Sequence, residues 1–135
     1  MSMTLNIQTP SRSSFIEITG KIQALIAKEG WDEGILLVFI AHTTAGITIN
    51  ENADPNVVRD FLADLDRLIP KHQSYYRHFE GNSDAHLKAS LMGSSVSIIV
   101  ENGRMVLGRW QGIYLCEFDG PRNREVHLKF LPVHD

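Results

Sequence analysis

The feature that most constrains the fold is an unbroken run of seven apolar residues at positions 35–41. Three of the seven are β-branched, and the run is far too short for a membrane-spanning helix, so it is typical of a buried strand. Because every side chain in it is apolar, we expect a central strand covered on both faces. His42, Thr43 and Thr44 follow at once. We therefore expect polar chemistry at the rim of the core.

Length and composition bound the class of protein. A chain of 135 residues suffices for one domain with a substantial core, so we expect a single domain over residues 1–135. The net charge is -3, from 13 Lys and Arg against 16 Asp and Glu, and no basic run suggests nucleic-acid binding. The sequence has no membrane-spanning run and no secretory signal pattern at its start. We expect a cytosolic protein whose partners are neither nucleic acid nor membrane.

Alternation of apolar and polar residues predicts the remaining strands. The pattern indicates strands at residues 5–9, 16–18, 46–50, 96–100, 105–107, 111–119 and 124–133. Asn102 and Gly103 form a strong hairpin signal. The single cysteine, Cys116, lies among apolar residues, and we expect an inert buried thiol.

Three helices are predicted between these strands. The first follows Thr19 as its N-cap and ends at Gly30. The second begins at Asp54 and Pro55 and is ended by Pro70. The third begins at Ser83 or Asp84 as N-cap and runs through Met92, whereas residues 71–82 are predicted as a loop with a short strand around 75–78. The predicted fold class is α+β, with mainly antiparallel sheets covered by two or three helices.

Glu117 shares a strand face with aliphatic residues, so its carboxylate needs a partner. An unpaired buried charge costs several kcal/mol and would be neutralised by protonation instead. A structural ion pair of Glu117 or Asp119 with Arg122, or with another arginine, is as compatible with the pattern as a functional role. On the last strand His127 is in phase with polar neighbours, so we expect a solvated surface histidine.

Three histidines, His42, His78 and His86, stand in polar settings suited to a site. His86 falls in the first turn of the third predicted helix, where the helix dipole disfavours the imidazolium form. Neutral imidazole ligates metal or accepts a proton, and two or three histidines could hold a divalent ion such as zinc or magnesium. Their spacing is not diagnostic. Hydrogen-bonded structural histidines and a metal-free acid-base site remain alternatives.

Two predicted helix N-termini, at residues 54–56 and 82–84, offer free amides of the kind that bind phosphate oxygens. Their acidic residues oppose an anion unless Arg122, Lys88 or a metal compensates. Ordinary helix capping is the alternative reading of both.

Several runs together resemble a known family. They are HTTAGITINENADPNVVRDF, YYRHFEGNSDAHLKASLMGSS and NGRMVLGRWQGIYLCEFDGPRNR, in this order. The sequence is similar to the YjbQ-like family, sometimes called the secondary thiamine-phosphate synthase family. The resemblance implies a YjbQ-like α+β fold, a homotrimer and a polar pocket near subunit contacts. Its motif positions correspond here to His42, Asn50, Glu51, Asn52, Asp54, His78, Asn82, Asp84, His86, Trp110, Gln111, Glu117, Asp119 and Arg122.

The resemblance also implies a reaction, the coupling of hydroxymethylpyrimidine diphosphate to a thiazole phosphate with release of diphosphate. On that basis we expect catalytic roles for His42, Glu117 and His86, and a metal on His42, His78 and His86. The expected substrate-binding residues are Asn50, Asn52, Asn82, Asp84, Gln111 and Arg122. Trp110 either stacks on a substrate ring or packs in the fold. The alternatives are a non-catalytic trimeric module that binds a metabolite or metal, and a metal-dependent hydrolase of phosphorylated metabolites.

Overall fold

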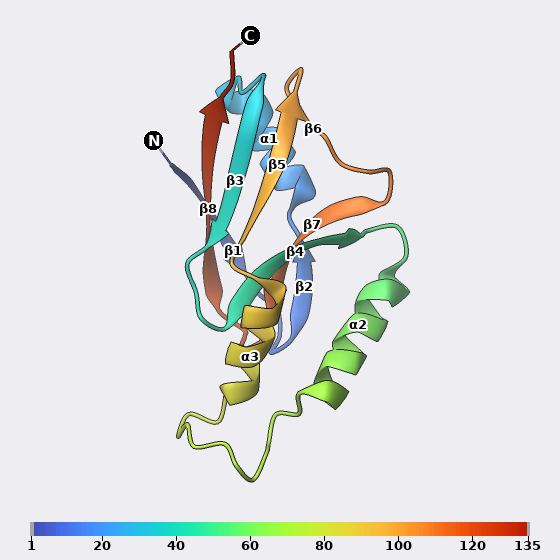
Figure 1. The fold of residues 1–135 in the computed structure, drawn as a ribbon, viewed down its shortest axis with the longest axis vertical. Helices are drawn as coiled ribbons and strands as arrows, with labels where there is room; N and C mark the ends of the chain where they lie inside the picture. Colours follow the sequence, from blue (N-terminus) through green and yellow to red (C-terminus); the bar gives the residue numbers. More distant parts are fainter. Residues whose placement is uncertain (1, 135) are drawn as a thin grey trace.

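The structure, a computed structural model, describes residues 2–134 and consists of two antiparallel sheets and three helices (Figure 1). The elements in chain order are β1 (Met3–Gln8), β2 (Ser14–Glu17), α1 (Thr19–Glu29), β3 (Gly34–Ile40), β4 (Ala45–Glu51), α2 (Pro55–Leu68), α3 (Ser83–Met92), β5 (Ser95–Glu101), β6 (Arg104–Met105), β7 (Gln111–Glu117) and β8 (Asn123–Pro132). The predicted α+β class is confirmed. No helix among these residues is long and apolar enough to cross a membrane.

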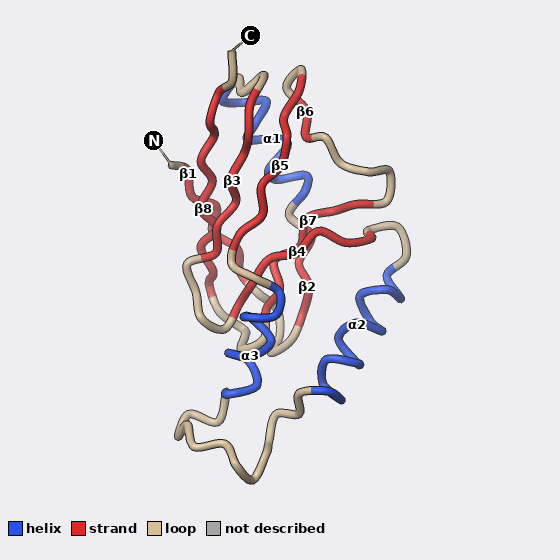
Figure 2. Tube along the Cα trace, in the orientation of Figure 1, coloured by secondary structure: helices blue, strands red, loops and turns tan. Residues whose placement is uncertain are grey.

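The two sheets divide the strands between them. The larger has the order β1-β8-β3-β5-β6 and the smaller β2-β7-β4, and every pairing is antiparallel. As predicted, β3 is central in its sheet. Figure 2 shows the two sheets in red, with α1 against the larger one and both α2 and α3 beside the smaller one.

The strand at residues 35–41 is covered on only one face, so the prediction of two covered faces is wrong for the single chain. Side chains on β3 alternate between buried and exposed, and Phe39 on the outer face is 41% exposed. Helix α1 packs on the inner face, and no helix among the described residues covers the outer one. The strand that is covered on both faces is β7, whose residues 112–117 are all buried.

Two hydrophobic clusters account for the burial of β7. One joins Ile113 and Leu115 to α1 and the larger sheet. The other joins Tyr114, Cys116 and Phe118 to α2 and α3, so the thiol is buried as predicted. The smaller sheet is therefore an inner layer, and Glu117, the last residue of its central strand β7, is fully buried.

The helix starts agree with the sequence in one case of three. Asp54 caps α2, since its carboxylate accepts a hydrogen bond from the Asn56 amide at 2.9 Å. Thr19 is the first residue of α1 rather than its cap, because its hydroxyl instead accepts a hydrogen bond from the Ile113 amide. Helix α3 has Asn82 at its N-cap position, so neither Ser83 nor Asp84 caps it.

The turns largely follow the sequence. Asn102 and Gly103 both have positive φ angles, 51° and 72°, as a tight hairpin turn requires. Gly30 ends α1 in the left-handed conformation. Residues 71–82 form a loop, seen below α3 in Figure 2, without the short strand predicted around residues 75–78.

Candidate functional site

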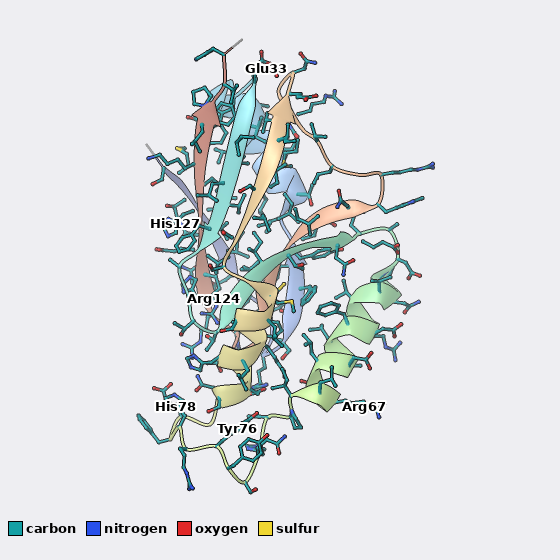
Figure 3. All side chains as sticks on the ribbon, in the orientation of Figure 1. Glu33, Arg67, Tyr76, His78, Arg124 and His127 are labelled. Carbon is teal, nitrogen blue, oxygen red and sulfur yellow. The ribbon has the colours of Figure 1, made fainter. Side chains whose placement is uncertain are left out.

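A pocket of about 470 Å³ lies where β3 ends and α3 begins. It is lined by the three histidines singled out from the sequence, His42, His78 and His86, and by further polar side chains that include Asn82, Asp119, Arg122 and Arg124. Figure 3 labels His78, on the segment before α3, and Arg124, at the start of β8. Segments far apart in the chain therefore meet at one pocket.

His42 lies two residues beyond β3 and is held by the neighbouring strand. Its Nε2 accepts a hydrogen bond from the Glu125 amide of β8 at 2.9 Å. The pairing of Ile40 with Val126 places this amide beside the histidine as the two strands separate. Partial burial, and then the charge of Arg124, lower the pKa of His42 below its usual value of 6.5. The ring is therefore neutral at neutral pH.

Glu117 is bound on both carboxylate oxygens behind the pocket wall. Arg124 donates to it from Nε at 2.7 Å and from Nη2 at 2.5 Å. The Thr9 hydroxyl adds a bond at 2.7 Å, and the Phe118 and Asp119 amides donate at 3.0 and 2.9 Å. Burial alone would raise the pKa of Glu117, but the hydrogen bonds from Arg124 and Asp119 outweigh it and hold the pKa below its usual range.

Glu117 therefore forms the structural ion pair that was one of the two alternatives from the sequence. Its partner is Arg124 and not Arg122. A carboxylate that accepts five hydrogen bonds and has no exposed surface is poorly placed to accept a proton from a substrate. Sequence reasoning missed Arg124, although a signal existed. Arg124 is in phase with Val126 and Leu128 on the buried face of β8.

Arg124 also orders the segment that follows His42. Its Nη2 donates to the Thr44 hydroxyl at 2.8 Å, in a buried contact. The Thr44 carbonyl in turn accepts from the Phe118 amide at 3.2 Å. The segment between β3 and β4 is thus fixed to β7 and β8 at several points. The pocket wall it forms is preorganised.

Arg122 and Asn82 both donate hydrogen bonds to the carboxylate of Asp119 at the pocket. Asn82 Nδ2 donates to Asp119 Oδ2 at 2.8 Å, and Arg122 Nη2 donates to the same oxygen at 3.1 Å. Arg122 Nε also bonds to the Asp119 carbonyl at 2.7 Å, yet the arginine side chain is 53% exposed. The Asn82 Oδ1 is buried without a partner among residues 2–134. The asparagine amide is therefore oriented by Asp119 rather than by capping α3.

His78 and His86 lie beside each other, with perpendicular rings and centroids 5.6 Å apart. His78 is 3.8 Å from the Glu80 carboxylate. Within residues 2–134 no group of three or more His, Cys, Asp or Glu side chains is arranged to hold a metal ion. His42 in addition has Nε2 occupied by an amide. The arrangement of His42, His78 and His86 therefore does not fit the predicted zinc or magnesium site.

Asp84, predicted to bind substrate, is part of a buried ionic cluster instead. Arg12 Nη2 donates to its carboxylate at 2.9 Å and Lys88 Nζ at 3.0 Å. Lys88, itself buried, also bonds to Asp66 of α2 at 2.6 Å. Burial favours the neutral acid, but the bonds from Arg12 and Lys88 hold the pKa of Asp84 below its usual range. The cluster fastens α3 to α2 and to the segment after β1.

Three other predicted substrate-binding residues, Asn50, Asn52 and Gln111, lie at the opposite end of the smaller sheet. In the β4–β7 register Ala45 faces Glu117 at one end and Glu51 faces Gln111 at the other. Asn52 donates to Glu17 at 2.9 Å, and Gln111 accepts from the Gly108 amide at 2.7 Å. The structure does not bring these residues to the pocket that His42 lines.

Trp110 lies at this opposite end too. It is 54% exposed, and the Arg109 guanidinium stands 4.7 Å from its ring centroid. It is therefore neither packed in the core nor beside the pocket that contains His42.

The chain is similar to known proteins over almost its whole length. A family model described as "UPF0047 protein YjbQ-like" matches residues 3–133. The UPF0047 protein YugU of Bacillus subtilis is 50% identical over 131 residues, which cover 97% of this chain and 99% of the relative. The UPF0047 protein MJ1081 of Methanocaldococcus jannaschii is 47% identical, over 97% of this chain and 94% of the relative.

Solved structures extend the similarity to the fold. A YjbQ/UPF0047 family protein from Clostridium acetobutylicum superposes with a TM-score of 0.92 at 53% identity, covering 96% of this chain and 99% of the other. A conserved hypothetical protein from Thermus thermophilus gives a TM-score of 0.90 at 44% identity, covering 96% and 99%. The arrangement of sheets and helices is that of these structures.

Proposed function

The chain belongs to the YjbQ-like UPF0047 family, and from this premise we propose that its pocket binds a small phosphorylated metabolite and catalyses a transfer of the thiamine-phosphate synthase type. The observation that carries the proposal is the convergence of Arg122, His42 and His86 on one preorganised pocket. The reaction itself rests on the family resemblance of the motifs that carry these residues.

Arg122 supplies the anion-binding group. Two of its N–H groups bond to Asp119, and its other guanidinium N–H groups have no acceptor among residues 2–134. A guanidinium binds phosphate oxygens through paired, charge-assisted hydrogen bonds. Its backbone is fixed as well, since the Arg122 amide donates to the Thr9 hydroxyl at 2.8 Å. A pocket of about 470 Å³ is of the size that small-molecule ligands occupy.

The proposed reaction depends more on stabilising the negative charge of the leaving diphosphate than on proton transfer. The thiazole nitrogen attacks the methylene carbon of the pyrimidine diphosphate, a C–N bond forms, and the C–O bond breaks. Diphosphate leaves with the electron pair, so negative charge develops on its bridging oxygen. Arg122 and the pocket histidines are the donors available to stabilise that charge. Because the metal donor set does not fit, no step is assigned to a metal.

An assay of the purified protein tests the proposal. With hydroxymethylpyrimidine diphosphate and thiazole phosphate as substrates, the wild type should form thiamine phosphate, and Arg122→Ala should lower kcat/KM at least tenfold, about 1.4 kcal/mol of transition-state binding. Gln111→Ala at the other end of the sheet is the matched control. Absence of product, together with failure to restore growth of a strain that lacks its main thiamine-phosphate synthase, would refute the transfer reaction.

A second candidate is a module that binds a phosphorylated metabolite without turning it over. The observation that favours it is that Glu117, expected from the family resemblance to be catalytic, has both carboxylate oxygens occupied by hydrogen bonds within the protein. Calorimetry with inorganic diphosphate separates the two candidates. Binding that Arg122→Ala weakens, without formation of product from the two substrates, would support the binding module.

We also propose that the chain assembles as a homotrimer through the outer face of its larger sheet. Apolar side chains of β3, β5 and β8 are exposed there, including Leu37, Phe39 and Ile99. A contiguous apolar surface of this kind marks a protein interface. Light scattering should give three times the chain mass of 15.2 kDa for the wild type and for Ala63→Glu on α2, and the single mass for Phe39→Glu. A monomeric wild type would refute the trimer.

A further inference from the structure

The hydrogen bond between the Glu125 amide and His42 fixes the position of the histidine proton. A backbone N–H can only donate, so the Nε2 that accepts it at 2.9 Å carries a lone pair and no proton. A neutral imidazole without a proton on Nε2 carries it on Nδ1. The backbone thereby selects one of the two tautomers.

The surroundings of the ring favour this neutral form. Partial burial is the largest influence, and the positive charge of Arg124 adds to it, so the pKa of His42 is lowered. Glu125, Glu117 and His127 are the other charged or titratable groups that affect it, and the two carboxylates oppose the shift. Glu117 is ionised and forms an ion pair with Arg124.

The Nδ1 atom has no hydrogen-bond partner among residues 2–134, and the ring lines the pocket. From this geometry we infer that His42 is a fixed, neutral hydrogen-bond donor, whose Nδ1–H binds an anionic oxygen of the ligand, and that it is neither a metal ligand nor a proton acceptor. The nature of the ligand in this inference rests on the proposed function. The tautomer does not.

Both excluded roles fail for the same reason. A metal ion or an incoming proton needs a lone pair on the nitrogen that faces the pocket. Freeing the lone pair of Nδ1 would move the proton to Nε2, where it would face the N–H of Glu125. Two donors would then oppose each other, and the ring would lose its hydrogen bond to the Glu125 amide.

Nuclear magnetic resonance of protein labelled with ¹⁵N-histidine tests the inference without an activity assay. Long-range ¹H–¹⁵N spectra distinguish protonated from unprotonated ring nitrogens, and loss of one ring system in His42→Asn assigns the signals. For His42 we expect Nδ1 in the protonated range and Nε2 in the unprotonated range. Inorganic diphosphate should shift Nδ1 and its proton, whereas Zn²⁺ should leave both nitrogens unchanged.

The outcomes separate the inference from the proposed function. A protonated Nε2, or a shift of either His42 nitrogen with Zn²⁺, would overturn the donor assignment. Diphosphate binding that leaves Nδ1 unshifted would overturn the contact with the anion. The expected tautomer without any diphosphate binding would support the fixed donor and contradict the proposed ligand class. In His42→Gln, which removes the donor at the Nδ1 position, diphosphate affinity should fall about tenfold, which corresponds to roughly 1.4 kcal/mol.

Discussion

The two ends of the three-stranded sheet both carry polar motifs, but they are built differently. At the Glu117 end, the side chain bonds to residues on other elements, Thr9 after β1 and Arg124 on β8, and these contacts are buried. At the Gln111 end, two side chains bond to close neighbours, Asn50 to the Glu51 amide and Gln111 to the Gly108 amide, and Gln111 is exposed.

The difference shows which polar groups fix distant segments to one another and which only stabilise local turns. Taking charged groups out of water is costly unless they are paired with good geometry. The Glu117 end meets that cost with a network that fixes the segment following His42. At the Gln111 end the bonds of Asn50 and Gln111 are local ones that exposed loops commonly make, and the bond from Asn52 to Glu17 is exposed to solvent. We propose on this basis that the ligand binds at the Glu117 end, and we expect variants at the two ends to differ in the following ways.

The largest difference should be in stability. Arg124→Leu leaves the buried Glu117 carboxylate without its main partner, and breaking such a pair costs about 3–5 kcal/mol. Gln111→Ala removes an exposed contact and should change the free energy of unfolding by less than about 0.5 kcal/mol. Urea unfolding followed by circular dichroism measures both. Equal, small losses would contradict the contrast between the two ends.

Low pH should also reduce stability through the Glu117 end of the sheet. The folded-state pKa of Glu117 lies below its usual value of 4.5, so its contribution to stability is complete above that pH and is lost as pH falls through the folded pKa. The free energy of unfolding of the wild type should therefore decline below about pH 4.5, and Glu117→Gln should flatten that decline. An unchanged acid profile in Glu117→Gln would show that other carboxylates control it.

Ligand affinity should follow the same division. Arg122→Ala should weaken the binding of inorganic diphosphate at least tenfold, or about 1.4 kcal/mol, since a charge-assisted contact is lost. Asn52→Ala, at the Gln111 end, should leave the dissociation constant within twofold. Titration calorimetry on both variants measures the effect. A loss of affinity in Asn52→Ala as large as that in Arg122→Ala would contradict the proposal that diphosphate binds at the Glu117 end.

The smallest effect is expected at Thr44. Thr44→Val removes the buried hydroxyl that accepts from Arg124 and should cost about 1 kcal/mol of stability. Thr48→Val on the following strand is the control, because the Thr48 hydroxyl has no partner among residues 2–134. Thermal unfolding of both variants tests this. Indistinguishable midpoints would mean that the hydroxyl contributes nothing to the segment.

The features predicted correctly from the sequence are those that a local sequence pattern determines. The central position of β3, the hairpin at Asn102 and the Asp54 cap all depend on residues near each other in the chain. The exposed outer face of β3 could not be predicted, because a run of apolar residues has the same sequence pattern whether one face of the strand or both are covered within the chain.

The site was only partly predictable for a similar reason. His42, Asn82 and Arg122 were identified and meet at the pocket. Asn52 and Gln111 belong to equally polar motifs, and strand periodicity does not reveal which end of a sheet such a motif occupies. Arg124 could have been found from its phase with Val126, which places a charge on a buried face and so demands a partner such as Glu117.

The most direct test of the central claim is a map of amide resonances during titration of the ¹⁵N-labelled protein with inorganic diphosphate. We expect the largest shifts on the pocket segments, at the amides of Thr43, Thr44 and Glu125, with the amides of Asn52 and Gln111 unchanged. Shifts concentrated at the Gln111 end, or no shifts at millimolar diphosphate, would contradict it.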